Sequence, residues 1–97
     1  MARIELAPEV GEDLTRILDH LHRHEIEHAA ARLREIIAAV DVLRTNPQIG
    51  RPANNDKREL VIGRGFHGYV ALYRYVAGID TVFVLAVRAQ GEAGFVR

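Results

Sequence analysis

The feature that most constrains the fold of this chain is a segment between Pro8 and Pro47 that contains no other proline. Its apolar residues recur at intervals of three and four, which is the period of an amphipathic helix. The apolar stripe does not keep one phase, however. Its first part ends at Leu21, and its second part, which begins at Ile26, lies on a different side of a continuous helix. We therefore predict two antiparallel helices joined near residues 22–26.

Local signals place the ends of these helices. Pro8 suits a first helical position, and acidic residues follow it, where the positive end of the helix dipole favours anions. The second helix is expected to stop at Asn46, because the residue before a proline is disfavoured in the helical region. A loop is predicted next, at Gly50, Pro52, Asn54 and Asn55.

Strands are predicted before and after the two helices in the sequence. Residues 3–6 alternate charged and apolar side chains, the period of a strand with one buried face. After residue 57 the composition shifts to strand formers in three runs, RELVI, YVALYRY and TVFVLAVRA. The predicted fold is α+β with the order β-α-α-β-β-β, a helical hairpin packed on one face of a mainly antiparallel sheet. We expect one domain over residues 1–97, with the first strand as a candidate neighbour of the last.

Composition narrows the classes of function. The chain has 97 residues, no cysteine, and equal numbers of basic and acidic side chains. The lack of cysteine excludes disulfides, iron-sulfur clusters and thiol nucleophiles, and zero net charge argues against a dedicated nucleic-acid binder. No apolar run is long enough for a signal peptide or a membrane span. We expect a cytoplasmic protein that does not enter a membrane.

The balanced charge is unevenly distributed along the chain. Acidic residues predominate up to residue 56, and basic residues, almost all of them arginine, predominate after it. Arginine and tyrosine are the residue types enriched at binding hot spots, although arginine stems also cover a core or pair with carboxylates. The candidate binding residues of the basic half are Arg58, Arg64, Arg74 and Arg88, with His67, Tyr73 and Tyr75 nearby.

Strand alternation sorts the residues of the last two runs by face. In YVALYRY it places Tyr69, Ala71, Tyr73 and Tyr75 on one face and Val70, Leu72 and Arg74 on the other. In TVFVLAVRA it places Phe83, Leu85 and Val87 opposite Val82, Val84, Ala86 and Arg88. Arg74 and Arg88 thus extend otherwise apolar faces, and we expect their guanidinium groups to emerge at a sheet edge or strand end.

Three histidines, His20, His24 and His28, lie at four-residue intervals. On one continuous helix they would line up as metal ligands. The break in the apolar stripe instead puts His20 at the end of one helix, His24 in the turn and His28 at the start of the next. We interpret them as solvated residues at helix ends, and we predict no metal and no cofactor.

No established catalytic motif is present. The sequence contains no nucleophile elbow, phosphate-binding P-loop or paired-carboxylate spacing, and GRGFHG leads into a strand rather than a helix. His67, the one histidine of the basic half, lies in that glycine-flanked turn. This environment is more typical of a turn residue than of a general base.

Several segments resemble the ParE branch of the RelE/ParE superfamily of bacterial toxins, and the similarity covers nearly the whole chain. The most specific are the alanine-rich second helix that ends in NPQIGRP, the REL that begins the second strand, the YVALYRY strand and the VRAQGEAGF tail. The resemblance implies the toxin of a type II toxin-antitoxin system, with a role in plasmid stabilisation. It also implies a ParD-like ribbon-helix-helix antitoxin as partner.

The resemblance distinguishes two activities. RelE-type toxins are ribosome-dependent endonucleases of messenger RNA, and the positions of their catalytic residues correspond here to Glu59, Val61, Val70, Gly91 and Phe95. These residues supply neither a cation for the scissile phosphate nor a terminal hydroxyl, so we expect no catalytic residues. ParE-like toxins instead poison DNA gyrase. That is stoichiometric protein binding, in which DNA is reached only through gyrase or the antitoxin.

Part of the tail motif also matches these relatives. Arg88, Gln90 and Glu92 agree with it, whereas Ala89 and Gly91 replace a histidine and a basic residue. The predicted target- or antitoxin-binding set is therefore Arg58, Arg64, His67, Tyr73, Arg74, Tyr75, Arg88, Gln90 and Glu92. Two alternatives remain: a RelE-like ribonuclease that uses Arg58, Arg64, His67 and Arg88, and a degenerate, non-toxic binding homologue.

Overall fold

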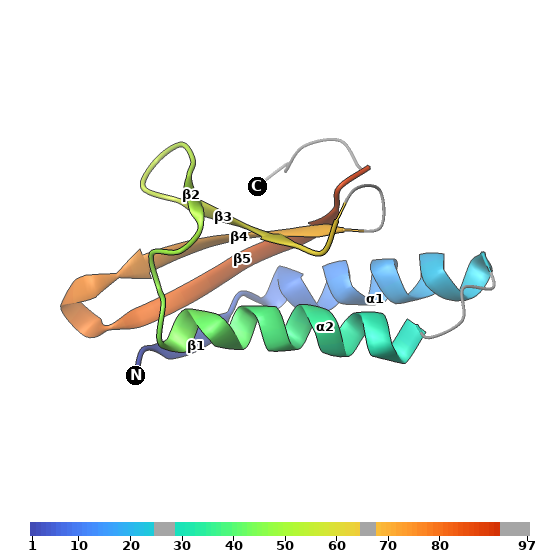
Figure 1. Cartoon of the computed structure of the whole chain (residues 1–97), viewed down its shortest axis with the longest axis horizontal. Helices are drawn as coiled ribbons and strands as arrows, with labels where there is room; N and C mark the ends of the chain where they lie inside the picture. Colours follow the sequence, from blue (N-terminus) through green and yellow to red (C-terminus); the bar gives the residue numbers. More distant parts are fainter. Residues whose placement is uncertain (25–28, 65–67, 92–97) are drawn as a thin grey trace.

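The computed structural model describes residues 1–24, 29–64 and 68–91. In chain order the elements are β1 (Arg3–Leu6), α1 (Pro8–Arg23), α2 (Ala29–Asp41), the 3-10 helix η1 (Val42–Arg44), β2 (Arg51–Pro52), β3 (Arg58–Ile62), β4 (Tyr69–Val76), the 3-10 helix η3 (Ala77–Ile79) and β5 (Thr81–Ala89). Figure 1 shows the two helices lying along one face of the sheet. The predicted α+β class is confirmed.

The sheet has five strands in the order β1-β5-β4-β3-β2. β1 runs parallel to β5, with Arg3 opposite Thr81 and Leu6 opposite Val84, while the other three pairs are antiparallel. The predicted proximity of the first and last strands is confirmed. The sheet also contains a strand that the sequence did not predict, because β2 lies in the expected loop. Pro52 is tolerated there since an edge strand leaves one side of its backbone unpaired.

The helices begin and end close to the predicted positions. α1 begins at Pro8 as predicted, whereas α2 ends before Asn46 and tightens into η1. The N–H groups of Thr45 and Asn46 both donate to the carbonyl oxygen of Val42, at 3.2 and 3.0 Å, and Leu43 anchors this turn in the core. Most of the predicted interhelical turn lies outside the described residues. Within the described ranges, no helix has the length and apolar character needed to cross a membrane.

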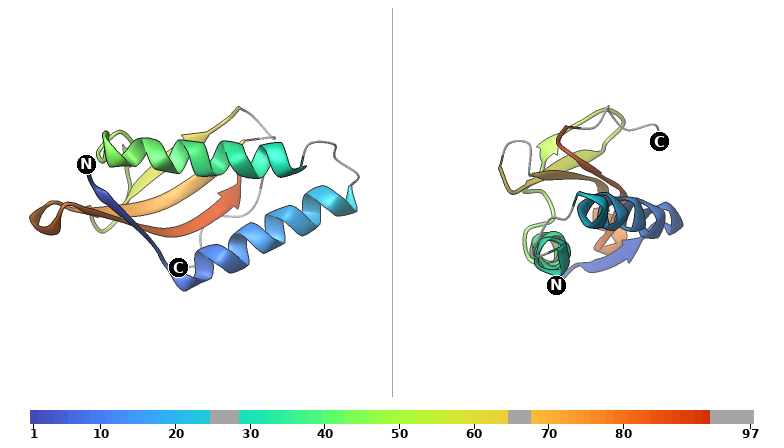
Figure 2. Two further views of the ribbon diagram at one scale, coloured as in Figure 1. Left: turned by 90° about the horizontal axis from the view of Figure 1, so that it is seen from below. Right: turned by 90° about the vertical axis from the view of Figure 1, so that its right-hand side faces the viewer.

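The end-on view of Figure 2 shows the helical hairpin on one side of the sheet, and the core lies between these two layers. α1 contributes Val10, Ile17 and Leu21, and α2 contributes Ile36. The sheet packs against them with buried aromatic and branched side chains. The predicted apolar stripes of the two helices therefore face the sheet. Among the described residues, the largest fully buried side chain is that of Tyr73.

A β-bulge interrupts the pairing of β4 and β5. Leu72 pairs with Ala86, and the next residue, Tyr73, pairs with Val84, so that Leu85 is an extra residue in β5. An extra residue changes which face of the sheet the following side chains occupy. The bulge therefore separates two segments of β5 that strict alternation would treat as one.

The bulge corrects the predicted faces of β5. Val87 lies on the helix side of the sheet together with Val82 and Val84, and all three belong to the core, whereas strict alternation predicts Val87 on the opposite face. Arg88 instead pairs with Val70 on the face away from the helices. Residues 81–89 contain no glycine or proline that would have marked the bulge in the sequence.

Candidate functional site

Two of the predicted binding residues, Arg58 and Tyr73, hold the loop that follows η1. Nη1 of Arg58 donates to the carbonyl oxygens of Gln48 and Gly50, at 3.2 and 2.8 Å. The hydroxyl oxygen of Tyr73 accepts a hydrogen bond from the Gly50 N–H at 2.8 Å. Tyr73 is fully buried, so in this conformation it offers no surface to a partner. Burial raises the pKa of the Tyr73 hydroxyl, while the Gly50 N–H and Arg58 act to lower it.

Arg74 and Tyr75 follow Tyr73 on β4, and their side chains form hydrogen bonds with two different turns. Nη2 of Arg74 donates to the carbonyl oxygen of Asn55 at 2.9 Å, and the guanidinium is exposed. The Tyr75 hydroxyl donates to Oδ1 of Asp80 at 2.7 Å, and this bond, ahead of burial, raises the pKa of Tyr75. Arg74 is thus accessible to a partner, while Tyr75 stabilises the turn between β4 and β5.

The remaining predicted residues belong to the other end of these strands. Arg64 is exposed just after β3, and Arg88 is half-buried on β5. Gln90 follows β5, and its N–H donates to the carbonyl oxygen of Gly68 at 2.9 Å. The structure therefore separates the predicted set into two groups at opposite ends of the sheet. His67 and Glu92 lie outside the described residues.

Arg58 and Arg88 also lie on opposite faces of the sheet. Arg58 pairs with Tyr73, whose ring belongs to the helix-side core. Arg88 pairs with Val70, which is buried but does not belong to that core. A catalytic site needs its charged groups on one side of the substrate, and these two guanidinium groups do not converge on one point.

An apolar groove opens between α1, α2 and β1. Its volume is about 230 Å³, and in Figure 2 (left) the two helices diverge towards β1 and leave the sheet visible between them. Leu6 and Ile37 line the groove and remain 58% and 56% exposed. The groove is lined by Ile4, Leu6, Val10, Leu14, Ile36, Ile37, Val40, Asp41, Arg44, Val84 and Val87. Leu6 and Ile37 are thus the exposed apolar side chains of a groove whose floor, at Val10, Ile36, Val84 and Val87, is buried.

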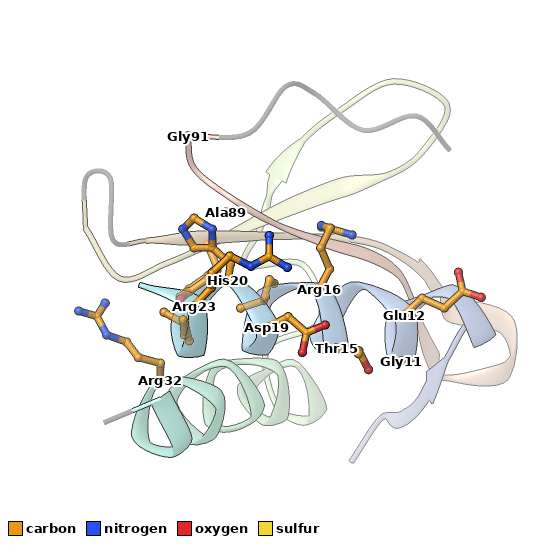
Figure 3. Close-up of a pocket in the computed structure, with 13 residues that line it drawn as sticks. Gly11, Glu12, Thr15, Arg16, Asp19, His20, Arg23, Arg32, Ala89 and Gly91 are labelled. Carbon is orange, nitrogen blue, oxygen red and sulfur yellow. The ribbon is translucent and has the colours of Figure 1, made fainter. Parts of the chain in front are cut away.

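A larger, charged groove of about 1060 Å³ lies between α1 and the C-terminal end of β5. In Figure 3, Arg16, His20 and Arg23 extend from α1 towards Ala89 and Gly91. Its lining residues are Gly11, Glu12, Thr15, Arg16, Ile17, Asp19, His20, Leu21, Arg23, Arg32, Tyr69, Ala89 and Gly91. Cations and anions alternate along this groove, so it does not present one sign of charge.

Tyr69 contributes a largely buried ring to the charged groove. Burial raises the pKa of its hydroxyl, Arg32 acts to lower it, and Glu35 acts to raise it. A neutral Tyr69 hydroxyl is the form present near neutral pH. The groove therefore offers a neutral phenol beside charged helical side chains.

The rings of His20 and His24 lie side by side at the C-terminal end of α1. Their ring centroids are 4.3 Å apart, because the N–H of His24 donates to the carbonyl oxygen of His20 and completes a helical turn. α1 ends at Arg23 and His24 is its C-cap, which agrees with the prediction that His24 lies in the turn after the helix. No group of three or more His, Cys, Asp or Glu side chains suited to a metal ion occurs within residues 1–24, 29–64 and 68–91.

The structure is thus a small α+β protein, with a helical hairpin on one face of a five-stranded mixed sheet and an apolar groove beside it. Residues 4–94 match the family described as "ParE toxin of type II toxin-antitoxin system, parDE". The chain belongs to this family and is a toxin of a type II toxin-antitoxin system.

Individual proteins are similar to the chain in sequence or in fold. The chain is 30% identical over 92 residues to Toxin RelE3 of Caulobacter vibrioides, covering 95% of this chain and 98% of that protein. Its fold is similar to a structure of the chromosomal ParDE system of P. aeruginosa, with a TM-score of 0.74 and 22% identity over 92% of this chain and 96% of the other. It is also similar to the archaeal RelE–RelB complex of Pyrococcus horikoshii, with a TM-score of 0.58 and 16% identity over 95% and 98%.

Proposed function

We propose that this toxin inhibits DNA gyrase by stoichiometric binding and that a ParD-like antitoxin neutralises it. The composition of the sheet face away from the helices is the observation that favours gyrase inhibition over RNA cleavage. Glu59, Val61 and Val70 occupy three of the positions that correspond to catalytic residues of RelE-type toxins. Val61 pairs directly with Val70, and Oε1 of Glu59 accepts a hydrogen bond from Arg51 at 3.0 Å. A carboxylate and two aliphatic groups give a scissile phosphate no stabilisation.

The placement of the arginines supports the same choice. A RelE-like ribonuclease built on Arg58 and Arg88 would need both guanidinium groups on one phosphodiester. These residues lie on opposite faces of the sheet, and Arg58 already donates to two loop carbonyls. The exposed cations Arg64 and Arg74 remain candidates for contacts with a protein target. Because gyrase is an intracellular target, the proposal also assigns the toxin to the cytoplasm, with DNA reached only through gyrase or the antitoxin.

The apolar groove supports an antitoxin that supplies a helix. An amphipathic helix buries apolar side chains at intervals of three and four in such a groove, and Leu6 and Ile37 are exposed there to receive them. Asp41 and Arg44 line one side of the groove as an ion pair at 2.6 Å. The groove thus combines an apolar floor with a polar margin, as protein interfaces do.

The proposal is tested with two assays on the same purified toxin. Gyrase supercoiling should fall, and cleaved DNA should accumulate, as the toxin approaches the concentration of gyrase, and added antitoxin should reverse both effects. Messenger RNA on translating ribosomes should stay intact. Cleaved messenger RNA with untouched supercoiling would show a RelE-like ribonuclease instead. Inactivity in both assays, with intact antitoxin binding, would show a non-toxic binding homologue.

A further inference from the structure

Two imidazoles stack at the C-terminal end of α1. His24 caps the helix, and its N–H donates to the carbonyl oxygen of His20 at 3.2 Å. The backbone therefore completes one helical turn between the two residues, which puts side chains four positions apart on the same side of the helix. Their ring centroids are 4.3 Å apart and the ring planes are inclined by 35°.

This separation suits the chelation of one metal ion by both rings. A bond from zinc to an imidazole nitrogen is about 2.0–2.1 Å long, so the two donor nitrogens of a chelate lie about 3 Å apart. Rings with centroids 4.3 Å apart and planes inclined by 35° have to turn about χ2, which is a soft torsion in histidine, before both lone pairs point to one ion. The helix thus holds His20 and His24 close to the arrangement that a shared ion needs.

Both imidazoles are accessible to an ion from solution. His20 and His24 are exposed, and within the described residues the contact that the structure shows for each ring is the other ring. A neutral imidazole has a lone pair on one nitrogen that can coordinate a metal. Neither ligand has to leave a buried position or break an ion pair to bind.

Charges of both signs lie around His20. The charged residues that line the groove beside it are Glu12, Arg16, Asp19, Arg23 and Arg32. Arg16 is paired with Asp13 at 2.8 Å. The C-terminal end of α1 adds the negative partial charge of its free carbonyl groups.

We propose that His20 and His24 form a two-histidine binding site for a transition-metal ion of the Zn²⁺, Ni²⁺ or Cu²⁺ type, with water completing the coordination. Imidazole nitrogens suit these ions, whereas Mg²⁺ and Ca²⁺ require oxygen ligands. Two protein ligands bind more weakly than the four of a structural zinc site. A bound ion joins the last two turns of α1 and leaves coordination positions open.

The test is a calorimetric titration of the full, tag-free chain with ZnCl₂. We expect one ion per chain in the wild type. His20→Ala and His24→Ala should each bind Zn²⁺ at least about tenfold more weakly, since each variant keeps one of the two donors. His22→Ala is the matched control, because residue 22 lies on a different side of the same helix. It should bind Zn²⁺ as the wild type does, and MgCl₂ should give no binding isotherm in any variant.

A further measurement locates the ion without relying on a variant. Substoichiometric Cu²⁺ should broaden the ring-proton NMR signals of His20 and His24 before that of His22. The proposal is wrong if His20→Ala and His24→Ala fold, by circular dichroism, and bind Zn²⁺ as tightly as the wild type. It is equally wrong if Cu²⁺ broadens all the histidines alike.

Discussion

Asp13 and Arg16, which lie nearly one turn apart on α1, together bind both backbone polar groups of Val87 on β5. Oδ2 of Asp13 accepts the Val87 N–H at 2.9 Å, and Nη2 of Arg16 donates to the Val87 carbonyl oxygen at 3.2 Å. The two side chains also pair with each other at 2.8 Å. β1 pairs with β5 only as far as Val84, so these side chains satisfy the edge of β5 beyond the end of β1.

Replacing Asp13 should therefore destabilise the fold strongly. Asp13 is only 3% exposed, and Asp13→Ala leaves the Val87 N–H without its acceptor and Arg16 without its carboxylate. We expect a loss of about 2–4 kcal/mol in the free energy of unfolding, measured by urea denaturation. Asp19→Ala, an exposed carboxylate on the same helix, should change it by about 0.5 kcal/mol or less. Equal effects of the two variants would show that the contacts to Val87 contribute little.

Asp13 also shows how far the fold could be predicted from the sequence. The start of α1 at Pro8, the two helices and four of the five strands follow from local periodicity and from prolines, and all of these are confirmed. The same local view treats Asp13 as one more anion in the first turns of a helix. Its actual partner is a backbone group more than seventy positions away, which no local pattern contains.

The candidate site was less predictable for the same reason. The sequence singled out Arg58 and Tyr73 as possible contacts, but both are committed to the loop around Gly50. The apolar groove depends on the angle between two helices, which the spacing of apolar residues does not specify. The sequence held one weak indication of the groove, since Ile37 beside Ile36 makes the apolar stripe of α2 wider than one buried face requires.

The loop around Gly50 should not tolerate a side chain at that position. A Cβ at Gly50 would lie 2.7 Å from both Cε1 and the hydroxyl oxygen of Tyr73 and 2.9 Å from the carbonyl oxygen of Glu59. Because Tyr73 is fully buried, Gly50→Ala should cost about 1–3 kcal/mol of stability. Gly11→Ala is the control, since a Cβ there meets nothing within 4 Å and alanine favours a helix by about 0.5–1 kcal/mol. Opposite shifts in the urea midpoint are expected, and a stabilised Gly50→Ala would contradict the packing around Tyr73.

Tyr73 should make the fold sensitive to alkaline pH. Burial raises the pKa of its hydroxyl above the ordinary value of 10.0, so the folded chain holds the proton more tightly than the unfolded chain does. The resulting stability is complete below pH 10 and is lost as the pH rises through the raised pKa. Urea denaturation between about pH 9 and about pH 12 should show this decline. Tyr73→Phe should start less stable at neutral pH and decline less steeply, and an unchanged slope would exclude Tyr73 as a cause.

The apolar groove should determine the affinity for the antitoxin. Ile37 is 56% exposed, so Ile37→Asp should leave the stability of the free toxin nearly unchanged while placing a carboxylate where an apolar helix face would dock. We expect the antitoxin to bind at least about tenfold more weakly, a loss of about 1.4 kcal/mol or more, measured by calorimetry with the toxin's own antitoxin. Ile79→Asp is the control, because Ile79 is 62% exposed but lies on η3, outside the groove. If Ile37→Asp binds like the wild type, or if Ile79→Asp weakens binding as much, the antitoxin uses another surface, and the gyrase assay remains an independent test of the toxin's target.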